Sequence, residues 1–202
     1  MINHSLFKKN RIKLKKKIIP NAICVFESND QMPTNADGLM PFKQNNDLFY
    51  LTGIDQEDTS LILFPEAKNQ DYQEILFIKK TNDTIRVWEG HKLTKQEAQK
   101  KSGIKTVLWN DEFISTLKHL IPDSSCVYLS SNEHPRANII VETRNARLRN
   151  MLKNLFPNNK LKKVSSIMHQ IRSIKEVEEV DAIKKACDIT KNGFNRILKF
   201  IK

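Results

Sequence analysis

The chain has 202 residues, which is room for one domain with a sizeable core and part of another. Hydrophobic residues make up 39% of it and charged residues 28%, a balance that fits a soluble globular protein. No apolar run reaches the length of a membrane span, and lysines at 15–17 stand where the apolar core of a signal peptide would begin. We therefore expect no membrane partner and a cytoplasmic location.

The net charge of +11 lies at the two ends of the chain. Residues 1–17 hold seven Lys and Arg and no acid, and residues 144–202 hold fifteen against five acids. Residues 18–143 are acidic, with twelve Lys and Arg against eighteen acids. Lysine-rich helix faces exposed to solvent account for this distribution better than one basic face does, so we expect no nucleic-acid partner.

Short apolar runs separated by turn residues predict a series of strands. Residues 48–50 are an apolar-aromatic run that suits a short buried strand or extended segment, and Gly53 after it can take a left-handed turn. The run that begins at Ser60 is ended by Pro65. The expected strands are 22–26, 48–50, 60–64, 74–78, 84–88, 106–109, 125–129 and 161–164.

Apolar residues at helical spacing predict helices between these strands. Residues 4–17 form an amphipathic helix with Phe7, Leu14 and Ile18 on one face. Further helices are expected at 94–103, opened by a capping box of Thr94 and Glu97, at 110–120, and at 138–155 with Ile140, Leu148, Leu152 and Leu155 turned inward. The alternation indicates an α/β fold with a mixed β-sheet flanked by helices on both faces.

A last helix is expected from a capping box at Ser173 and Glu176 to about Lys202. It carries an apolar stripe that needs something to pack against: this domain, a second copy of the chain, or a further domain. The stripe consists of Val177, Val180, Ile183, Cys187, Phe194, Ile197 and Ile201.

The cysteines and histidines are not spaced like the ligands of a metal site. Cys24, Cys126 and Cys187 are odd in number, far apart and outside any CxxC motif, so we expect buried free thiols. The histidines show no metal-ligand pairing either. They are His4, His91, His119, His134 and His169.

An acidic turn holds Asp55, Glu57 and Asp58 directly before an apolar run. These carboxylates are compatible with a cation site, but a solvated turn before a strand explains them as well and is the interpretation we favour. We therefore expect no metal and no catalytic residue within this chain.

Two stretches of the chain resemble the N-terminal region of the aminopeptidase P (Xaa-Pro aminopeptidase) family, which also groups with prolidase and creatinase. The first follows the pattern F-R-Q-x-S-D-F-Y-Y-L-T-G-F, with Asn46 in place of the usual Ser and Leu48 in place of Phe. The second resembles the family's junction with its catalytic "pita-bread" domain. The matching residues are Phe42, Gln44, Asp47, Tyr50, Leu51, Thr52 and Gly53, then Arg172, Ile174, Lys175, Glu179 and Val180.

The resemblance implies a creatinase/prolidase-type N-terminal domain, ribonuclease H-like, over residues 1–171. Residues 172–202 would be the junction and the first helix of a catalytic domain that is absent from this chain. The parent would be a metallopeptidase with two ions, usually manganese, in that domain, and the segment alone would be inactive. Expected partners are the catalytic domain, other subunits of a homo-oligomer and a peptide with proline at its second position.

Two alternatives stay open at this point. The parent could be a prolidase-type dipeptidase, because the residues that decide the substrate lie mostly outside this chain. The chain could also be a stand-alone, non-catalytic binding or assembly module.

Trp88 is the one candidate site residue. The segment 88–90, Trp-Glu-Gly, resembles the family's I-W-x-G segment, with Val87 in place of Ile and His91 where Arg is frequent. In bacterial-type members this Trp reaches from one subunit toward a neighbour's active site, so the resemblance implies that Trp88 helps shape a substrate pocket. The alternative is a tryptophan that packs in the core or at the end of a strand.

Overall fold

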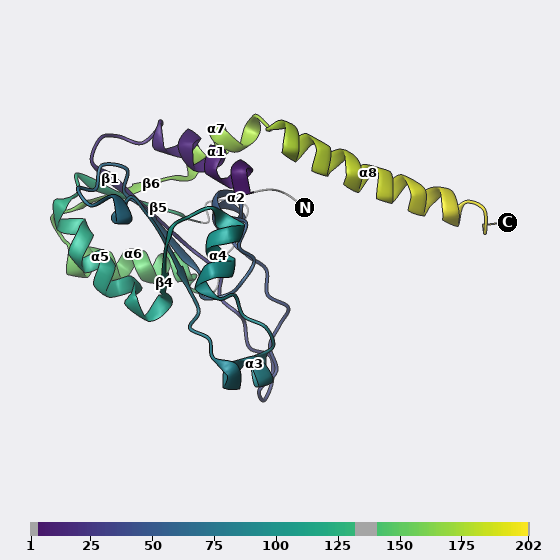
Figure 1. Cartoon of the computed structure of the whole chain (residues 1–202), viewed down its shortest axis with the longest axis horizontal. Coiled ribbons are helices and arrows are strands. Elements are labelled where there is room, and N and C mark those ends of the chain that lie inside the picture. The colour runs from purple at the N-terminus through teal and green to yellow at the C-terminus, as the bar shows by residue number, and fades with distance from the viewer. Residues whose placement is uncertain (1–3, 132–140, 202) are drawn as a thin grey trace.

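The computed structural model describes residues 4–131 and 141–201. Its centre is a six-stranded sheet in the order β4-β3-β2-β1-β5-β6 (Figure 1). β2 is antiparallel to both of its neighbours, and the other pairs are parallel, so the predicted mixed sheet is confirmed. The strands are β1 Ala22–Glu27, β2 Ser60–Leu63, β3 Glu74–Ile78, β4 Thr106–Trp109, β5 Cys126–Leu129 and β6 Lys160–Lys163.

Helices cover both faces of the sheet, as the sequence predicts. One apolar cluster joins the sheet to α1 His4–Lys15, α2 Asn46–Thr52, α4 Lys95–Ser102 and α7 Ser165–Ser173. The opposite cluster joins it to α5 Phe113–Leu120, which follows the short 3₁₀ turn Asn110–Glu112, and to α6 Arg144–Leu155. Further 3₁₀ turns lie at Gln70–Tyr72 and Ile121–Asp123. Among the described helices, none combines the length and the apolar character that crossing a membrane requires.

The expected strand at 48–50 is wrong, because these residues belong to helix α2. Asn45 caps the helix: its side-chain oxygen accepts hydrogen bonds from the backbone N–H groups of Asp47 and Leu48 at 3.0 and 3.1 Å. Gly53, with φ +69°, ends it in the predicted left-handed conformation. Leu48 and Leu51 are three residues apart, so one helix face buries both against the sheet.

The expected strand at 84–88 is also wrong, because these residues lie in helix α3 Asp83–Glu89. The Asn82 side chain accepts a hydrogen bond from the N–H of Ile85 at 2.8 Å and caps the first turn. The apolar residues of this short helix stay outside both core clusters. The alternation of apolar and polar residues at 84–88 therefore does not correspond to a strand with one buried face.

The C-terminal third departs from the prediction in three details. α6 begins after Thr143, its N-cap, and the expected helical residues 138–140 fall outside the described part of the chain. Leu148 and Leu152 are buried as predicted, whereas Leu155 is 43% exposed at the last turn of α6. The long helix α8 Val177–Ile197 is capped by Glu176 with Glu179, not by the predicted pair at 173 and 176, because residue 174 is extended.

α8 leaves the body of the molecule and buries none of its residues (Figure 1). The exposed stripe includes Cys187, so the prediction that all three thiols are buried is wrong for this one. Cys24 and Cys126 are buried and free as expected.

Candidate functional site

Trp88 lies on an excursion of the chain between β3 and α4. We call residues 79–93 the Trp88 arm; it carries α3 and projects from one end of the sheet (Figure 1). Trp88 is 84% exposed and Val87 before it is 78% exposed. A core tryptophan is therefore excluded, and the largest aromatic surface of the arm faces outward.

The two ends of the Trp88 arm are held together by one carboxylate. Glu57 accepts a hydrogen bond from the Lys92 ammonium at the end of the arm, and the Lys79 ammonium at its start lies 3.6 Å from the same oxygen. The N–H of Leu93 donates to the side-chain oxygen of Gln56 at 2.8 Å. The arm therefore projects from a clamped base, so its tip is presented by a defined structure.

The charge of Glu57 is stabilised where it lies. Burial acts to raise its pKa, but the hydrogen bond from Lys92 and the positive charges of Lys92 and Lys79 outweigh burial and hold the pKa below its ordinary value. Glu57 is thus an ionised clamp at neutral pH. Lys79 also pairs with Glu89 at 2.5 Å, which ties the last residue of α3 to the base of the arm.

Two carboxylates of the acidic turn, Glu57 and Asp58, take part in ion pairs. Glu57 pairs with two lysines, and Asp58 lies 2.8 Å from a guanidinium nitrogen of Arg144. Within the ranges 4–131 and 141–201, no three His, Cys, Asp or Glu side chains are grouped as metal ligands. These residues do not fit the two metal ions that the family resemblance implies for the parent. His134 lies outside the described residues.

His91 contacts an acid of α4 near the C-terminal end of the arm. Its Nε2 lies 3.3 Å from an oxygen of Glu97, and both side chains are exposed. His91 therefore takes part in a surface contact near the capping box of α4, at the position where the family pattern often has Arg.

The two stretches that carry the family resemblance meet in space. Asp47 in α2 pairs with Arg172 at the end of α7, with 2.6 Å between oxygen and nitrogen. The Tyr50 hydroxyl donates to the backbone oxygen of Ile171 at 3.0 Å, and burial raises the pKa of Tyr50 to about 12. Gln44 donates to two backbone oxygens of the following loop. Asp47 and Tyr50 therefore hold the end of α7 to the sheet domain, and Gln44 fixes the loop after α2.

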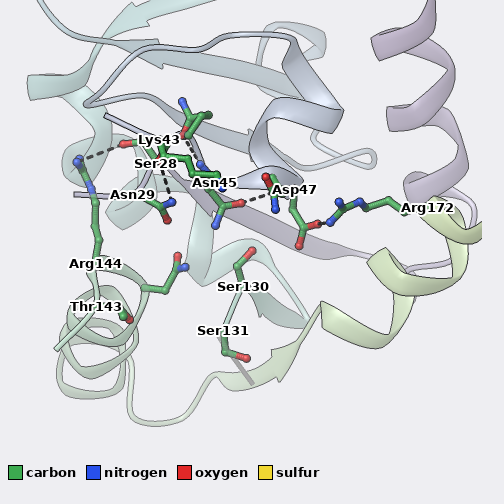
Figure 2. A pocket seen from close by; sticks show the side chains of 13 residues that line it. Ser28, Asn29, Lys43, Asn45, Asp47, Ser130, Ser131, Thr143, Arg144 and Arg172 are labelled. Atoms are coloured by element: carbon green, nitrogen blue, oxygen red, sulfur yellow. Dashed lines mark hydrogen bonds and ion pairs between the residues drawn. The ribbon is translucent and has the colours of Figure 1, made fainter. Parts of the chain in front are cut away.

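A pocket that sequence reasoning missed lies beyond the carboxyl ends of β1 and β5, beside this junction (Figure 2). It has a volume of about 320 Å³ and a polar lining from the segments that follow β1 and β5 and from α2, α6 and α7. The sequence offered one signal: Ser130 directly follows a predicted strand, and Ser28 lies two residues after the end of another. Sequence alone did not show that these two strands are parallel neighbours.

Sequence comparisons match the chain to aminopeptidases of one family. The family described as "Aminopeptidase P, N-terminal domain" matches residues 7–129. The chain is 24% identical over 199 residues to the Xaa-Pro aminopeptidase of Escherichia coli (strain K12), which covers 98% of this chain and 45% of the relative. It is 26% identical over 196 residues to Xaa-Pro aminopeptidase 3 of Dictyostelium discoideum, covering 96% of this chain and 36% of the relative.

Solved structures share the fold. A protein described as an aminopeptidase P from Bacillus anthracis superposes with a TM-score of 0.86 at 26% identity, over 95% of this chain and 45% of that one. Aminopeptidase P from E. coli superposes with a TM-score of 0.77 at 21% identity, over 94% and 43%. The chain spans less than half the length of these proteins. Since the family match covers more than half of the chain, the chain belongs to the aminopeptidase P family and carries its N-terminal domain.

Proposed function

We propose that the chain is the N-terminal domain of a metal-dependent Xaa-Pro aminopeptidase, which releases the N-terminal residue of a peptide ahead of proline. The observation that carries this proposal is the match of nearly the whole chain to Xaa-Pro aminopeptidases from two organisms. The described residues hold no group that fits a metal, so the proposal assigns the two manganese ions and the peptide chemistry to a further domain of the parent. The chain alone is expected to be inactive.

The exposed stripe of α8 supports a boundary near residue 172. Residues up to 171 form the packed body, and α8 after it buries nothing. An apolar helix face without a partner gains free energy when another surface covers it. In this proposal α8 is the first helix of the catalytic domain. The ion pair of Asp47 with Arg172 then fixes the start of the junction against the N-terminal domain.

The proposed role of Trp88 is to form one wall of the substrate pocket in a neighbouring subunit. Its support is geometric: a large aromatic side chain stands at the tip of a clamped arm and is exposed in the single chain. Tryptophan buries a large surface when a partner covers it and is frequent among residues that dominate binding. The domain would then also support assembly of the homo-oligomer.

The test uses the full-length parent with manganese and Xaa-Pro-Xaa peptides of increasing length. Replacing Trp88 by Ala is expected to lower kcat/KM roughly tenfold, the effect of losing about 1.4 kcal/mol of binding to the transition state. Leu155→Ala, which changes an exposed apolar residue at the end of α6, serves as the control and is expected to keep wild-type kinetics. Unchanged kcat/KM for every peptide length in Trp88→Ala would refute the wall role.

A second candidate function is a stand-alone assembly module, which the exposed stripe of α8 also favours. In that case the stripe is covered by a second copy of the chain. Analytical ultracentrifugation of the 202-residue chain separates the two, because a stable dimer that Ile183→Asp dissociates supports the module. A longer parent that cleaves Xaa-Pro bonds, beside an inactive and monomeric short chain, supports the enzyme domain.

A further inference from the structure

The polar pocket beside the junction lies where open α/β sheets place their ligands. We call it the strand-end pocket; Ser28 follows β1 and Ser130 follows β5, and these strands are parallel neighbours. From β1 the chain continues to β2 on one side, whereas from β5 it continues to β6 on the other side. The intervening helices α2 and α6 belong to opposite faces of the sheet. Such a divergence opens a crevice at the carboxyl ends of the strands.

One hydroxyl of this pocket is buried and unpaired within the described part of the chain. Ser130 is 5% exposed, and its Oγ makes no hydrogen bond with residues 4–131 or 141–201. Figure 2 shows this hydroxyl directed into the space that the pocket residues enclose. Because a buried unpaired hydroxyl costs free energy, this atom indicates a hydrogen-bonding ligand. At about 320 Å³, the pocket is large enough for a small molecule.

The charged side chains around the pocket are paired with one exception. Asp47 is neutralised by Arg172 at 2.6 Å, and Arg144 lies between Glu27 at 3.0 Å and an aspartate of the acidic turn. Lys43 also lines the pocket, and its ammonium has no ion pair among residues 4–131 and 141–201. The uncompensated charge of the lining is therefore positive.

The first turn of α6 adds backbone N–H donors, which carry partial positive charge. Thr143 is the N-cap, and its hydroxyl accepts a hydrogen bond from the N–H of Ala146 at 3.3 Å. The N–H groups of Arg144 and Asn145 come earlier in the turn, where helix geometry leaves them without an intrahelical acceptor. Both residues line the pocket, and the start of a helix of 12 residues carries partial positive charge.

We propose that the strand-end pocket binds a small oxyanion, a carboxylate or a phosphate group, between Lys43, Ser130 and the first turn of α6. The available groups are an ammonium, a hydroxyl and backbone N–H donors, all of which pair with anionic oxygens. The carboxylate of the lining is already neutralised, which removes the repulsion it would otherwise exert. The proposal is independent of the peptidase function and would hold for this chain alone.

The test titrates the 202-residue chain with inorganic phosphate and, separately, with acetate at constant ionic strength, and follows backbone amide chemical shifts by NMR. Saturable shifts centred on residues 130, 144 and 145 are expected. Lys43→Gln and Ser130→Ala should each weaken binding roughly tenfold, since one charged or charge-assisted hydrogen bond is lost. The matched control is Lys118→Gln, an exposed lysine on α5, which should bind like the wild-type chain.

The two probes distinguish the source of the oxyanion. Saturation by phosphate alone identifies a phosphate group, and saturation by acetate identifies a carboxylate. The proposal is overturned if neither anion saturates these amides, or if Lys43→Gln and Ser130→Ala, shown to be folded by circular dichroism, both bind with wild-type affinity. Equal weakening by Lys118→Gln would also overturn it, because nonspecific charge would then explain the binding.

Discussion

Helices α1 and α8 are both amphipathic in sequence, yet the structure uses them in opposite ways. α1 buries Leu6, Phe7 and Leu14, and Leu14 joins the apolar cluster on that face of the sheet. α8 is nearly twice as long, and its apolar stripe stays in solvent. An apolar stripe therefore indicates that a helix packs against a partner, but it does not indicate whether that partner belongs to the same domain.

The contacts between these two helices are ionic and lie at the surface. Lys9 pairs with Glu178 at 2.7 Å, and Lys13 pairs with Glu176 at 2.6 Å. Exposed pairs of this kind contribute little to stability because water and salt screen them. They orient the start of α8, whereas packing holds α1 in place. Substitutions in the two regions should accordingly differ in their effects.

The largest difference is expected between Leu14→Ala and Ile183→Ala. Leu14 is fully buried in α1, so its truncation should lower the free energy of unfolding by about 2–5 kcal/mol. Ile183 is an exposed member of the α8 stripe, and its truncation should change that free energy by less than about 0.5 kcal/mol. Urea denaturation of the isolated chain measures both. Similar losses would mean that α8 packs on the body in solution.

A second substitution, at Gly53, disturbs the packing of Phe7 in α1. At Gly53 an added Cβ would lie 2.2 Å from the Phe7 ring, and φ is +69°. Gly53→Ala should therefore cost about 1–3 kcal/mol of the free energy of unfolding through strain and overpacking.

The matched control for this substitution is Gly103→Ala. Gly103 also follows a helix with φ +72°, but its Cβ would meet only the movable His4 side chain at 3.2 Å. This change should cost about 1 kcal/mol, the conformational part alone. Equal costs at the two glycines, again from urea denaturation, would contradict the proposed contact with Phe7.

The clamp of the Trp88 arm gives a smaller, pH-dependent effect. The pKa of Glu57 is lowered from 4.5 in the folded chain, so its ionised form stabilises the fold above pH 4.5. This stabilisation is lost as the pH falls through the folded-state pKa. Wild type should therefore exceed Glu57→Gln in stability at pH 7, and the difference should shrink below pH 4.5.

Urea denaturation between pH 7 and pH 3 measures this difference, and hydrogen exchange of residues 79–93 shows whether the arm loosens with it. Asp111→Asn is the control. Asp111 is exposed, and its pair with Lys80 is long, with 3.6 Å between nitrogen and oxygen. A difference between wild type and Glu57→Gln that stays constant across this range would show that the charge of Glu57 does not stabilise the fold.

The smallest effect is expected for Trp88→Ala in the isolated chain. Trp88 contacts little of the body, so the free energy of unfolding should change by less than about 0.5 kcal/mol. The same chemical denaturation experiment measures it, with tyrosine fluorescence or circular dichroism as the signal. A loss above 1 kcal/mol, on the order of a buried side chain, would mean that the arm folds back onto the sheet and leaves no exposed wall.

The sequence by itself determined the central strands and the family. β1, β2, β3 and β5 are continuous apolar runs because a strand in the middle of a covered sheet is buried on both faces. The capping box of Thr94 and Glu97 was readable because its partners are three residues apart. The motif over residues 42–53 identified the family without any knowledge of its conformation, and that conformation was predicted incorrectly.

Only the tertiary structure decided the conformation of the short apolar runs and the placement of polar groups. Three or four apolar residues are too few to separate a strand from one or two helical turns, so the caps at Asn45 and Asn82 were decisive. The strand-end pocket and the junction pair of Asp47 and Arg172 join residues more than a hundred positions apart. Such pairings depend on strand order and helix packing, which no local pattern of residues encodes.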